Sequence, residues 1–185
     1  MKHLTIIVAH PDDEVIFGAA ILKEAKKIVC VASDENNPAR AWCKDRKKAL
    51  TKIGELLGIE TACLGYNSEF YRQADPRTGG LIAIEKDLLP YIFGNIFTHN
   101  AWGEYGHMDH ILVNQIVRAH SDHILTTDIC LQAGWFNVRK LPQGSLFKRV
   151  TIDPDLYVRC KAIYDKYGCW TWSKSPIVDV GVCEA

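Results

Sequence analysis

Short apolar runs alternate with amphipathic segments along most of the chain, and this alternation constrains the fold more than any other feature. The expected strands are 4–9, 27–32, 61–64 and 95–99, with later strand-like runs at 128–133 and 146–152. The expected helices are 14–26, 38–57, 81–89, 107–120 and about 154–167. Strands and helices that alternate at this spacing form βαβ units around a mostly parallel sheet. Because crossovers are right-handed, the sequence predicts an α/β, Rossmann-like, doubly wound sheet with helices on both faces.

The chain is expected to form a single domain, residues 1–185. Its 185 residues can bury a sizeable core, and neither a repeat nor a linker divides them. Lys+Arg and Asp+Glu both number 22, so the formal net charge is zero. This balance argues against a general nucleic-acid binder, which usually carries a basic excess. It also gives no sign of binding to a membrane surface.

Cysteine usage and the N-terminal residues point to a cytoplasmic location. The seven cysteines are odd in number and show no Cys-x-x-Cys spacing, which favours reduced thiols over a disulfide framework. The N-terminal apolar run is interrupted at His10, too early for a secretory signal. No stretch approaches the roughly 18 apolar residues of a membrane span. The sequence does not specify an oligomeric state.

The expected strand order, 3-2-1-4-5, places the strands 4–9 and 95–99 side by side where the winding reverses. Ligands of such folds bind at this switch point, outside the carboxyl ends of the strands. The first of these strands runs into His10, and the other ends at His99. The glycine fingerprint of dinucleotide binding is missing after the first strand, so a dinucleotide is not expected. The fold therefore predicts that two polar clusters, nearly 100 residues apart, meet in one crevice.

The first cluster is His10-Pro11-Asp12-Asp13-Glu14. Pro11 has a fixed φ and keeps its predecessor out of the helical region, which forces a bend between strand and helix. The acids by themselves are also typical of a helix N-terminus, where they cap the chain and favour the helix dipole. That reading leaves His10 unexplained. Glu14 receives no role beyond that of an acid in the first turn.

The second cluster runs from Thr98 to His110. His107 and His110 are three residues apart at the start of a helix, so they share a face. Asp109 can reach an imidazole and fix its tautomer, although capping and solvent exposure would also explain it. Together the clusters offer a His, Asp and His set that suits catalytic zinc, with another carboxylate free as a base. The residues alone do not choose between Asp12 and Asp13 as the metal ligand.

Ala9 to Glu14 resembles the first signature of the PIG-L/LmbE-like N-acetylglucosaminyl deacetylase family, and Thr98 to His110 resembles the second. Arg46, in a helix that closes in Leu57-Gly58, is similar to the family's arginine helix. The resemblance covers residues 4–120 well and the rest loosely. It implies the following roles, residue by residue: zinc ligands His10, Asp13 and His110, general base Asp12, oxyanion-stabilising or amine-protonating His107, Asp109 as the orienting partner of His107, and substrate-contacting Arg46.

The resemblance implies a zinc-dependent hydrolase that removes the acetyl group from an N-acetylated amino sugar of the N-acetylglucosamine type, or from its conjugate. One zinc ion per chain is expected, with another divalent metal as the alternative. The expected partner is thus a small-molecule N-acetylated sugar or sugar conjugate. Trp102 is a candidate to stack on the sugar ring, and the alternative is that it only packs against the rest of the protein. Two other functions stay open: a metal-dependent hydrolase of another bond, such as a different N-acyl amide or a phosphoester, and a non-catalytic module that binds a metal or a sugar.

Overall fold

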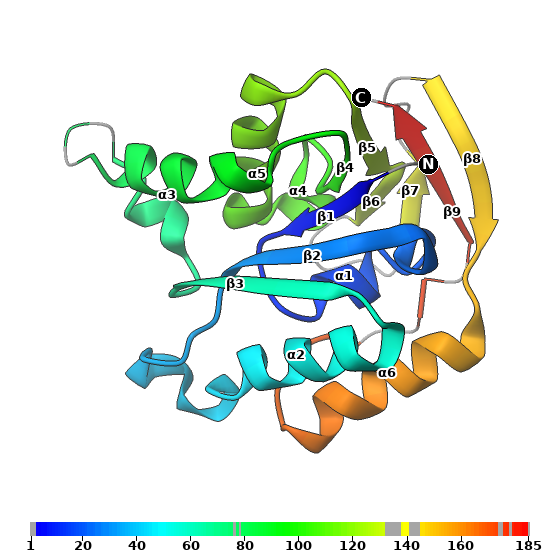
Figure 1. The fold of residues 1–185 in the computed structure, drawn as a ribbon, viewed down its shortest axis with the longest axis horizontal. Helices are drawn as coiled ribbons and strands as arrows, with labels where there is room; N and C mark the ends of the chain where they lie inside the picture. The colour runs from blue at the N-terminus through cyan, green and yellow to red at the C-terminus, as the bar shows by residue number, and fades with distance from the viewer. Residues whose placement is uncertain are drawn as a thin grey trace.

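A mostly parallel β-sheet with the strand order β3-β2-β1-β4-β5-β9-β8 runs through the computed structural model (Figure 1). The structure describes residues 3–75, 77, 79–131, 138–140, 145–173, 176–177 and 179–184. The strands are β1 Leu4–Val8, β2 Ala25–Ala32, β3 Glu60–Tyr66, β4 Asn95–Thr98, β5 Ile124–Thr127, β6 Ile129–Leu131, β7 Val138–Lys140, β8 Ser145–Thr151 and β9 Asp179–Glu184. The α-helices are α1 Asp13–Ile16, α2 Arg46–Leu57, α3 Gly80–Leu88, α4 Gly103–Gly106, α5 Met108–His120 and α6 Pro154–Lys166. Short 3-10 helices are Leu22–Glu24, Pro38–Cys43, Phe70–Arg72 and Leu89–Tyr91.

The predicted fold class and the order of the first five sheet strands are confirmed. β3, β2, β1, β4 and β5 are parallel neighbours, and β9 and β8 extend the sheet in antiparallel fashion. The fifth parallel strand is Ile124–Thr127 rather than the predicted 128–133. Asp128 interrupts the run, and Ile129–Leu131 pairs with β7 in a separate two-stranded sheet. The remaining residues of that prediction, 132–133, lie outside the described residues.

Two predicted helices are shorter than expected. The helix predicted at 14–26 ends at Ile16, because Gly18 is a poor helix former and Ala25 must already pair with Leu4 in the sheet. The helix predicted at 38–57 begins only at Arg46. The Asn37 side chain caps a 3-10 turn before it, and Arg40 inside that turn has non-helical backbone angles. The α2 helix ends as predicted, with Gly58 in the left-handed conformation.

Helices cover both faces of the sheet, as predicted, and the alternation of side chains along β1 explains how (Figure 1). Ile6 and Val8 pack into a core that includes residues of α2 and α6. Ile7 and Ala9 point the other way, into a core that includes residues of α3 and α5. Successive strand residues alternate between faces, so a strand buried on both sides is apolar throughout. None of the helices in the described part of the chain is both long and apolar enough to cross a bilayer.

The parallel register of β1 and β4 brings the two polar clusters together. Ile7 lies opposite Thr98, so the chain leaves both strands at the same edge of the sheet. His10 follows β1 and His99 follows β4 directly. The predicted meeting of the clusters at the switch point is therefore confirmed.

Candidate active site

The turn between β1 and α1 presents His10, Asp12 and Asp13 on consecutive backbone positions. Asp12 has φ 107° and ψ −25°, a left-handed conformation that is strained for any residue other than glycine. Its carbonyl oxygen accepts hydrogen bonds from the backbone of Val15 and Ile16, at 3.0 Å and 2.9 Å, which starts α1. The strained turn thus places a carboxylate on either side of the point where the helix begins.

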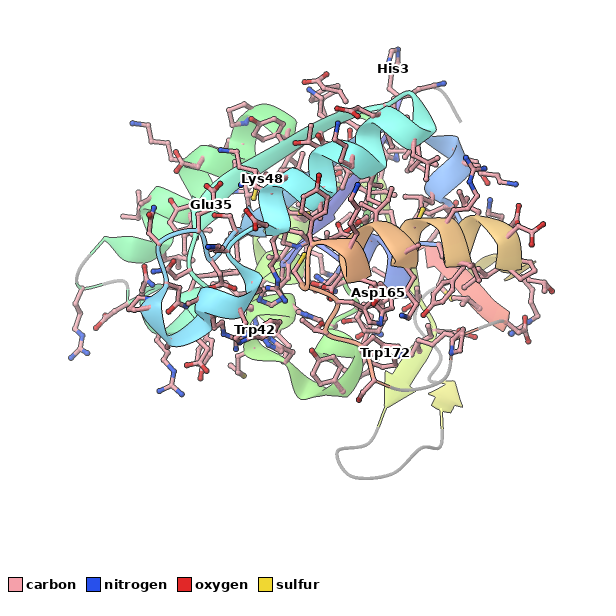
Figure 2. All side chains as sticks on the ribbon, turned by 90° about the horizontal axis from the view of Figure 1, so that it is seen from below. His3, Glu35, Trp42, Lys48, Asp165 and Trp172 are labelled. Atoms are coloured by element: carbon pink, nitrogen blue, oxygen red, sulfur yellow. The ribbon has the colours of Figure 1, made fainter. Side chains whose placement is uncertain are left out.

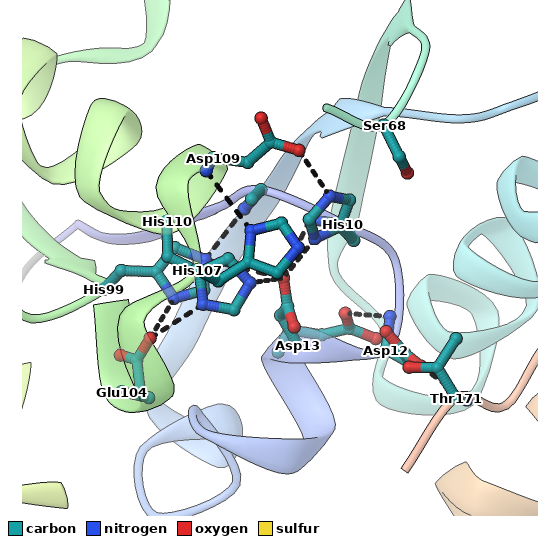
Figure 3. Close-up of polar contacts among 12 residues, drawn as sticks. His10, Asp12, Asp13, Ser68, His99, Glu104, His107, Asp109, His110 and Thr171 are labelled. Carbon is teal, nitrogen blue, oxygen red and sulfur yellow. Dashed lines mark hydrogen bonds and ion pairs between the residues drawn. The ribbon is translucent and has the colours of Figure 1, made fainter. Parts of the chain in front are cut away.

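The start of α5 supplies the facing imidazoles (Figure 3). His107 is the N-cap of this helix, and its Nδ1 accepts the backbone N–H of Asp109 at 3.2 Å. His110 lies in the first turn and stacks between two other rings, 3.7 Å from His99 and 4.5 Å from His107 between ring centroids. The histidines of the two clusters therefore form one contiguous group beside Asp13.

Asp13 is the centre at which the imidazoles converge. Its Oδ2 lies 3.2 Å from His10 Nδ1 and 3.3 Å from His110 Nε2. Burial would raise the pKa of Asp13, but His110, His10 and His99 hold it well below its usual range. His110 Nε2 is buried and makes no well-formed hydrogen bond among the described residues. A buried nitrogen that makes no well-formed hydrogen bond, and that faces a carboxylate and a second imidazole, fits a metal ligand.

Among the described residues, two overlapping groups of donor atoms could hold a metal ion, with all atoms of a group within 4.8 Å of one another. One consists of His10, His107 and His110, and the other of Asp13, His99 and His110. His99 has no free lone pair, because its Nε2 accepts the backbone N–H of Ala9 at 2.9 Å and its Nδ1 faces Glu104 at 3.0 Å. His107 likewise accepts a backbone N–H, from Asp109, on its Nδ1. The available donors are therefore the three residues expected as ligands, His10, Asp13 and His110.

The Asp109 carboxylate contacts His10, whereas the sequence predicted a contact with the side chain of His107. Its Oδ2 lies 3.0 Å from His10 Nε2, and the backbone N–H groups of Glu69 and Tyr71 donate to its two oxygens at 2.7 Å and 2.9 Å. His107 instead turns its Nδ1 back to the backbone of Asp109, as a helix cap does. Asp109 therefore contacts His107 through its backbone N–H, while its carboxylate orients His10, an expected metal ligand.

The Glu104 carboxylate orients His110 in the same way that Asp109 orients His10. No pattern in the sequence assigned a role to Glu104. Its Oε2 lies 2.8 Å from His110 Nδ1 and 3.0 Å from His99 Nδ1, and it is 1% exposed. Burial would raise the pKa of Glu104, but His99 and His110 lower it to about 2. The only local signal was an acid between two glycines, Gly103 and Gly106, whose positive φ angles permit the tight loop.

Asp12, the expected base, is held by a residue that no pattern in the sequence indicated. Thr171 donates both its backbone N–H, at 2.9 Å, and its hydroxyl, at 2.5 Å, to Asp12 Oδ2. The other oxygen, Oδ1, is buried without a hydrogen-bond partner in the described structure. Burial raises the pKa of Asp12 to about 6, against the opposing charge of Arg46.

Glu14 also has more than the first-turn role that the sequence suggested. It is fully buried, and its two oxygens accept the Tyr164 hydroxyl at 2.5 Å and the backbone N–H of Asp12 at 3.0 Å. Burial raises the pKa of Glu14 to about 8. This side chain therefore links α6 to the strained turn.

A cavity of about 320 Å³ opens at the expected base, Asp12, and at two of the expected ligands, His10 and Asp13. Arg46, buried and paired with Asp34 at 3.1 Å, lines it together with Trp172. Trp102 is 43% exposed and is not among the described residues that line this cavity, whereas the aromatic side chains of Phe17, Tyr105 and Trp172 are. Figure 2 shows Trp172 and Trp42 on the same side of the molecule.

The fold and the site define a class of α/β proteins that gather histidines and aspartates at the switch point of a parallel sheet. Residues 5–133 match the model of the PIG-L family, described as GlcNAc-PI de-N-acetylase, and the chain belongs to this family. Membership supports a hydrolytic N-deacetylase of sugar-type substrates. A search of curated proteins finds no match.

Solved structures share the whole fold at low sequence identity. A deacetylase of teicoplanin biosynthesis, solved with teicoplanin, has a TM-score of 0.65 and 13% identity, over 100% of this chain and 99% of that chain. GalB, the 4-carboxy-2-hydroxymuconate hydratase of Pseudomonas putida KT2440, has 0.59 and 13%, over 99% and 95%. The A40926 pseudoaglycone deacetylase Dbv21 has 0.59 and 17%, over 90% and 81%. At these identities the likeness shows the fold alone.

Proposed function

We propose that the protein is a zinc-dependent hydrolase that removes the acetyl group from an N-acetylated amino sugar of the N-acetylglucosamine type, or from its conjugate. The observation that carries this proposal is the pairing of a buried carboxylate that has one free oxygen, Asp12, with the adjacent His10, Asp13 and His110 donors. The family description supports it, as do two structural neighbours that are deacetylases, one of teicoplanin biosynthesis and one of the A40926 pseudoaglycone.

His10, Asp13 and His110 would hold the metal, since their donor atoms meet and their outer faces are already oriented by Asp109 and Glu104. Imidazole nitrogen with carboxylate oxygen suits zinc, and another divalent metal is the alternative. When bound, such an ion polarises a carbonyl and lowers the pKa of a water molecule toward roughly 7.

Asp12 takes the proton of the attacking water on Oδ1, the oxygen that no described group occupies. Attack on the acetamide carbonyl leaves negative charge on the carbonyl oxygen. The proton held by Asp12 then passes to the amide nitrogen as the C–N bond breaks. The products are a free amine and acetate, so the proton is returned and the carboxylate is restored.

His107 stabilises the developing oxyanion by donating a hydrogen bond. Burial and the neighbouring His110 and His10 lower the pKa of His107 to about 3, so the ring is neutral near pH 7. Since Nδ1 accepts a backbone N–H, the neutral ring carries its proton on Nε2. A preorganised donor of this kind contributes most where water is excluded.

The cavity wall would select the sugar. Trp172 offers an apolar face for a pyranose ring, and Arg46 lines the same cavity with an Nε that has no partner in the described structure. We retain Arg46 as a substrate contact and transfer the stacking role from Trp102 to Trp172.

The deciding experiment is acetate release from a panel of N-acetylglucosamine conjugates by purified protein of known metal content. Activity that disappears with a chelator and returns with Zn²⁺ supports the proposal. Metal binding without acetate release from any conjugate would favour a binding module, and release of another acid from other N-acyl compounds would favour a different amidohydrolase. The panel needs both N-acetylglucosamine conjugates and other N-acyl compounds because a hydratase shares the fold, and the fold alone does not select a reaction.

A further inference from the structure

We propose that Thr171 is a positioning residue that holds one oxygen of Asp12 and so reserves the other, Oδ1, for the proton. The inference rests on the proposed function, and it deepens the role of Asp12. Thr171 lies outside the residues 5–133 that match the family model, in the segment that follows α6. The match to the family therefore assigns nothing to this residue.

The two oxygens of Asp12 have opposite surroundings (Figure 3). Oδ2 accepts two hydrogen bonds, from the N–H and the hydroxyl of Thr171. Oδ1 is buried and has no partner among the residues that the structure describes, and Asp12 lines the cavity. A carboxylate that is ionised can accept on both oxygens, so the arrangement leaves one free, desolvated acceptor on a residue that lines the cavity.

Asp12 depends on such an external contact. The χ2 torsion of aspartate is broad and roughly two-fold, so a carboxylate without partners turns freely and exchanges its oxygens. Helix α1 has only four residues, and the Asp12 side chain makes no capping hydrogen bond to it. Two donors on one oxygen remove this freedom, and they stabilise the orientation that points Oδ1 at the site of attack.

The segment that carries Thr171 is itself anchored to α6. The backbone N–H of Cys169 donates to Tyr164 O at 3.0 Å, and the Trp170 indole donates to Trp172 O at 2.6 Å. The Trp170 ring packs on that of Tyr164, at 6.1 Å between centroids.

The same helix holds the Asp12 backbone through a second path. The Tyr164 hydroxyl donates to Glu14, and Glu14 accepts the backbone N–H of Asp12. The backbone and the carboxylate of the strained residue are thus both tied to one C-terminal unit, although Thr171 and Asp12 are 159 residues apart. Helix α6 and the segment that follows it therefore have the geometry to keep the Asp12 carboxylate in a single orientation.

The test compares Thr171→Val with Thr171→Ser in the zinc-loaded protein, on a conjugate that the wild type deacetylates. Valine keeps the shape and the backbone N–H but removes the hydroxyl, which donates to a charged group. We expect kcat to fall on the order of 10- to 100-fold in Thr171→Val, with unchanged KM and metal content. Serine restores the hydroxyl, so Thr171→Ser is expected to stay within about threefold of the wild type. Thr51→Val is the matched control, since that hydroxyl only bonds Lys47 O on the exposed side of α2.

A wild-type kcat in Thr171→Val overturns the inference, as does a loss that serine fails to restore or that follows the metal content. A wild type that releases no acetate from any conjugate overturns the proposed function instead. Crystal structures of the two Thr171 variants then test the positioning role independently of any activity measurement. The Asp12 carboxylate should be turned in Thr171→Val and unturned in Thr171→Ser, and an identical carboxylate in both variants refutes it.

Discussion

The Oδ2 of Asp109 lies 3.0 Å from the Nε2 of His10, and this contact determines which nitrogen of His10 faces the candidate metal site. An ionised carboxylate only accepts, so Nε2 carries the ring proton. The lone pair of Nδ1 is then directed toward Asp13 Oδ2, 3.2 Å away. Carboxylates behind metal-binding imidazoles fix the tautomer and increase ligand basicity in this way.

We therefore expect Asp109→Asn to weaken metal binding about 10- to 100-fold, because the neutral amide no longer supports His10. Competition with a chelator of known affinity measures the dissociation constant directly. Asp122→Asn, an exposed position just beyond α5, is the control and should bind the metal as the wild type does. Equal affinities in the two variants would show that the Asp109 contact does not matter for the metal.

Asp12→Asn separates the base from the ligands. The variant should keep its metal, because Asp12 lies outside both groups of donor atoms, and it should lose at least about 10²-fold in kcat. Metal analysis alongside acetate release checks both statements on the same preparation. Loss of the metal in this variant would mean that the assignments of Asp12 and Asp13 must be exchanged.

The buried pair of Arg46 and Asp34 yields a prediction about stability. Arg46→Met removes the partner of a buried carboxylate, which costs about 3–5 kcal/mol where nothing else compensates the charge. Asp34 keeps four further donors in the described structure, from Asn37, from the backbone and hydroxyl of Ser68, and from the Cys43 thiol. We therefore expect a smaller loss, about 1–3 kcal/mol in the free energy of unfolding, measured by urea denaturation of the metal-free protein.

The control for Arg46→Met is Lys52→Met on the exposed side of the same helix, where the ion pair with Glu55 is open to solvent. This variant should lie within about 0.5 kcal/mol of the wild type. A loss in Arg46→Met that does not exceed the loss in the control would contradict a structural role for the buried pair.

Glu14 predicts a pH dependence of stability. Burial raises its folded pKa to about 8, from an ordinary value of 4.5, so the folded protein binds the extra proton between these values. This contribution is fully present below pH 4.5, declines as the pH rises, and is lost above about pH 8. Denaturation of the metal-free protein at a series of pH values measures it. Glu14→Gln imitates the protonated form and should flatten the decline, and an unaltered slope in that variant would assign the dependence to other groups.

Local sequence patterns predicted the parts of the fold that depend on periodicity and on stop signals. The apolar run of β1, the helix end at Gly58 and the α5 helix from Met108 follow this rule. The predicted helix at 14–26 extends too far, because sheet pairing of Ala25 overrides a helical apolar pattern. Strand β9 was missed because its pairing partners, β5 and β8, are distant in sequence.

The sequence by itself determined that His10, Asp12 and Asp13 would meet His107 and His110, because parallel strands 1 and 4 end at one edge of the sheet. It also determined the family, since the two signatures are local. Only the tertiary structure decided which carboxylate orients which imidazole, and that Thr171 holds Asp12. Such contacts depend on side-chain direction and on packing between distant segments, and neither leaves a periodic trace in the chain.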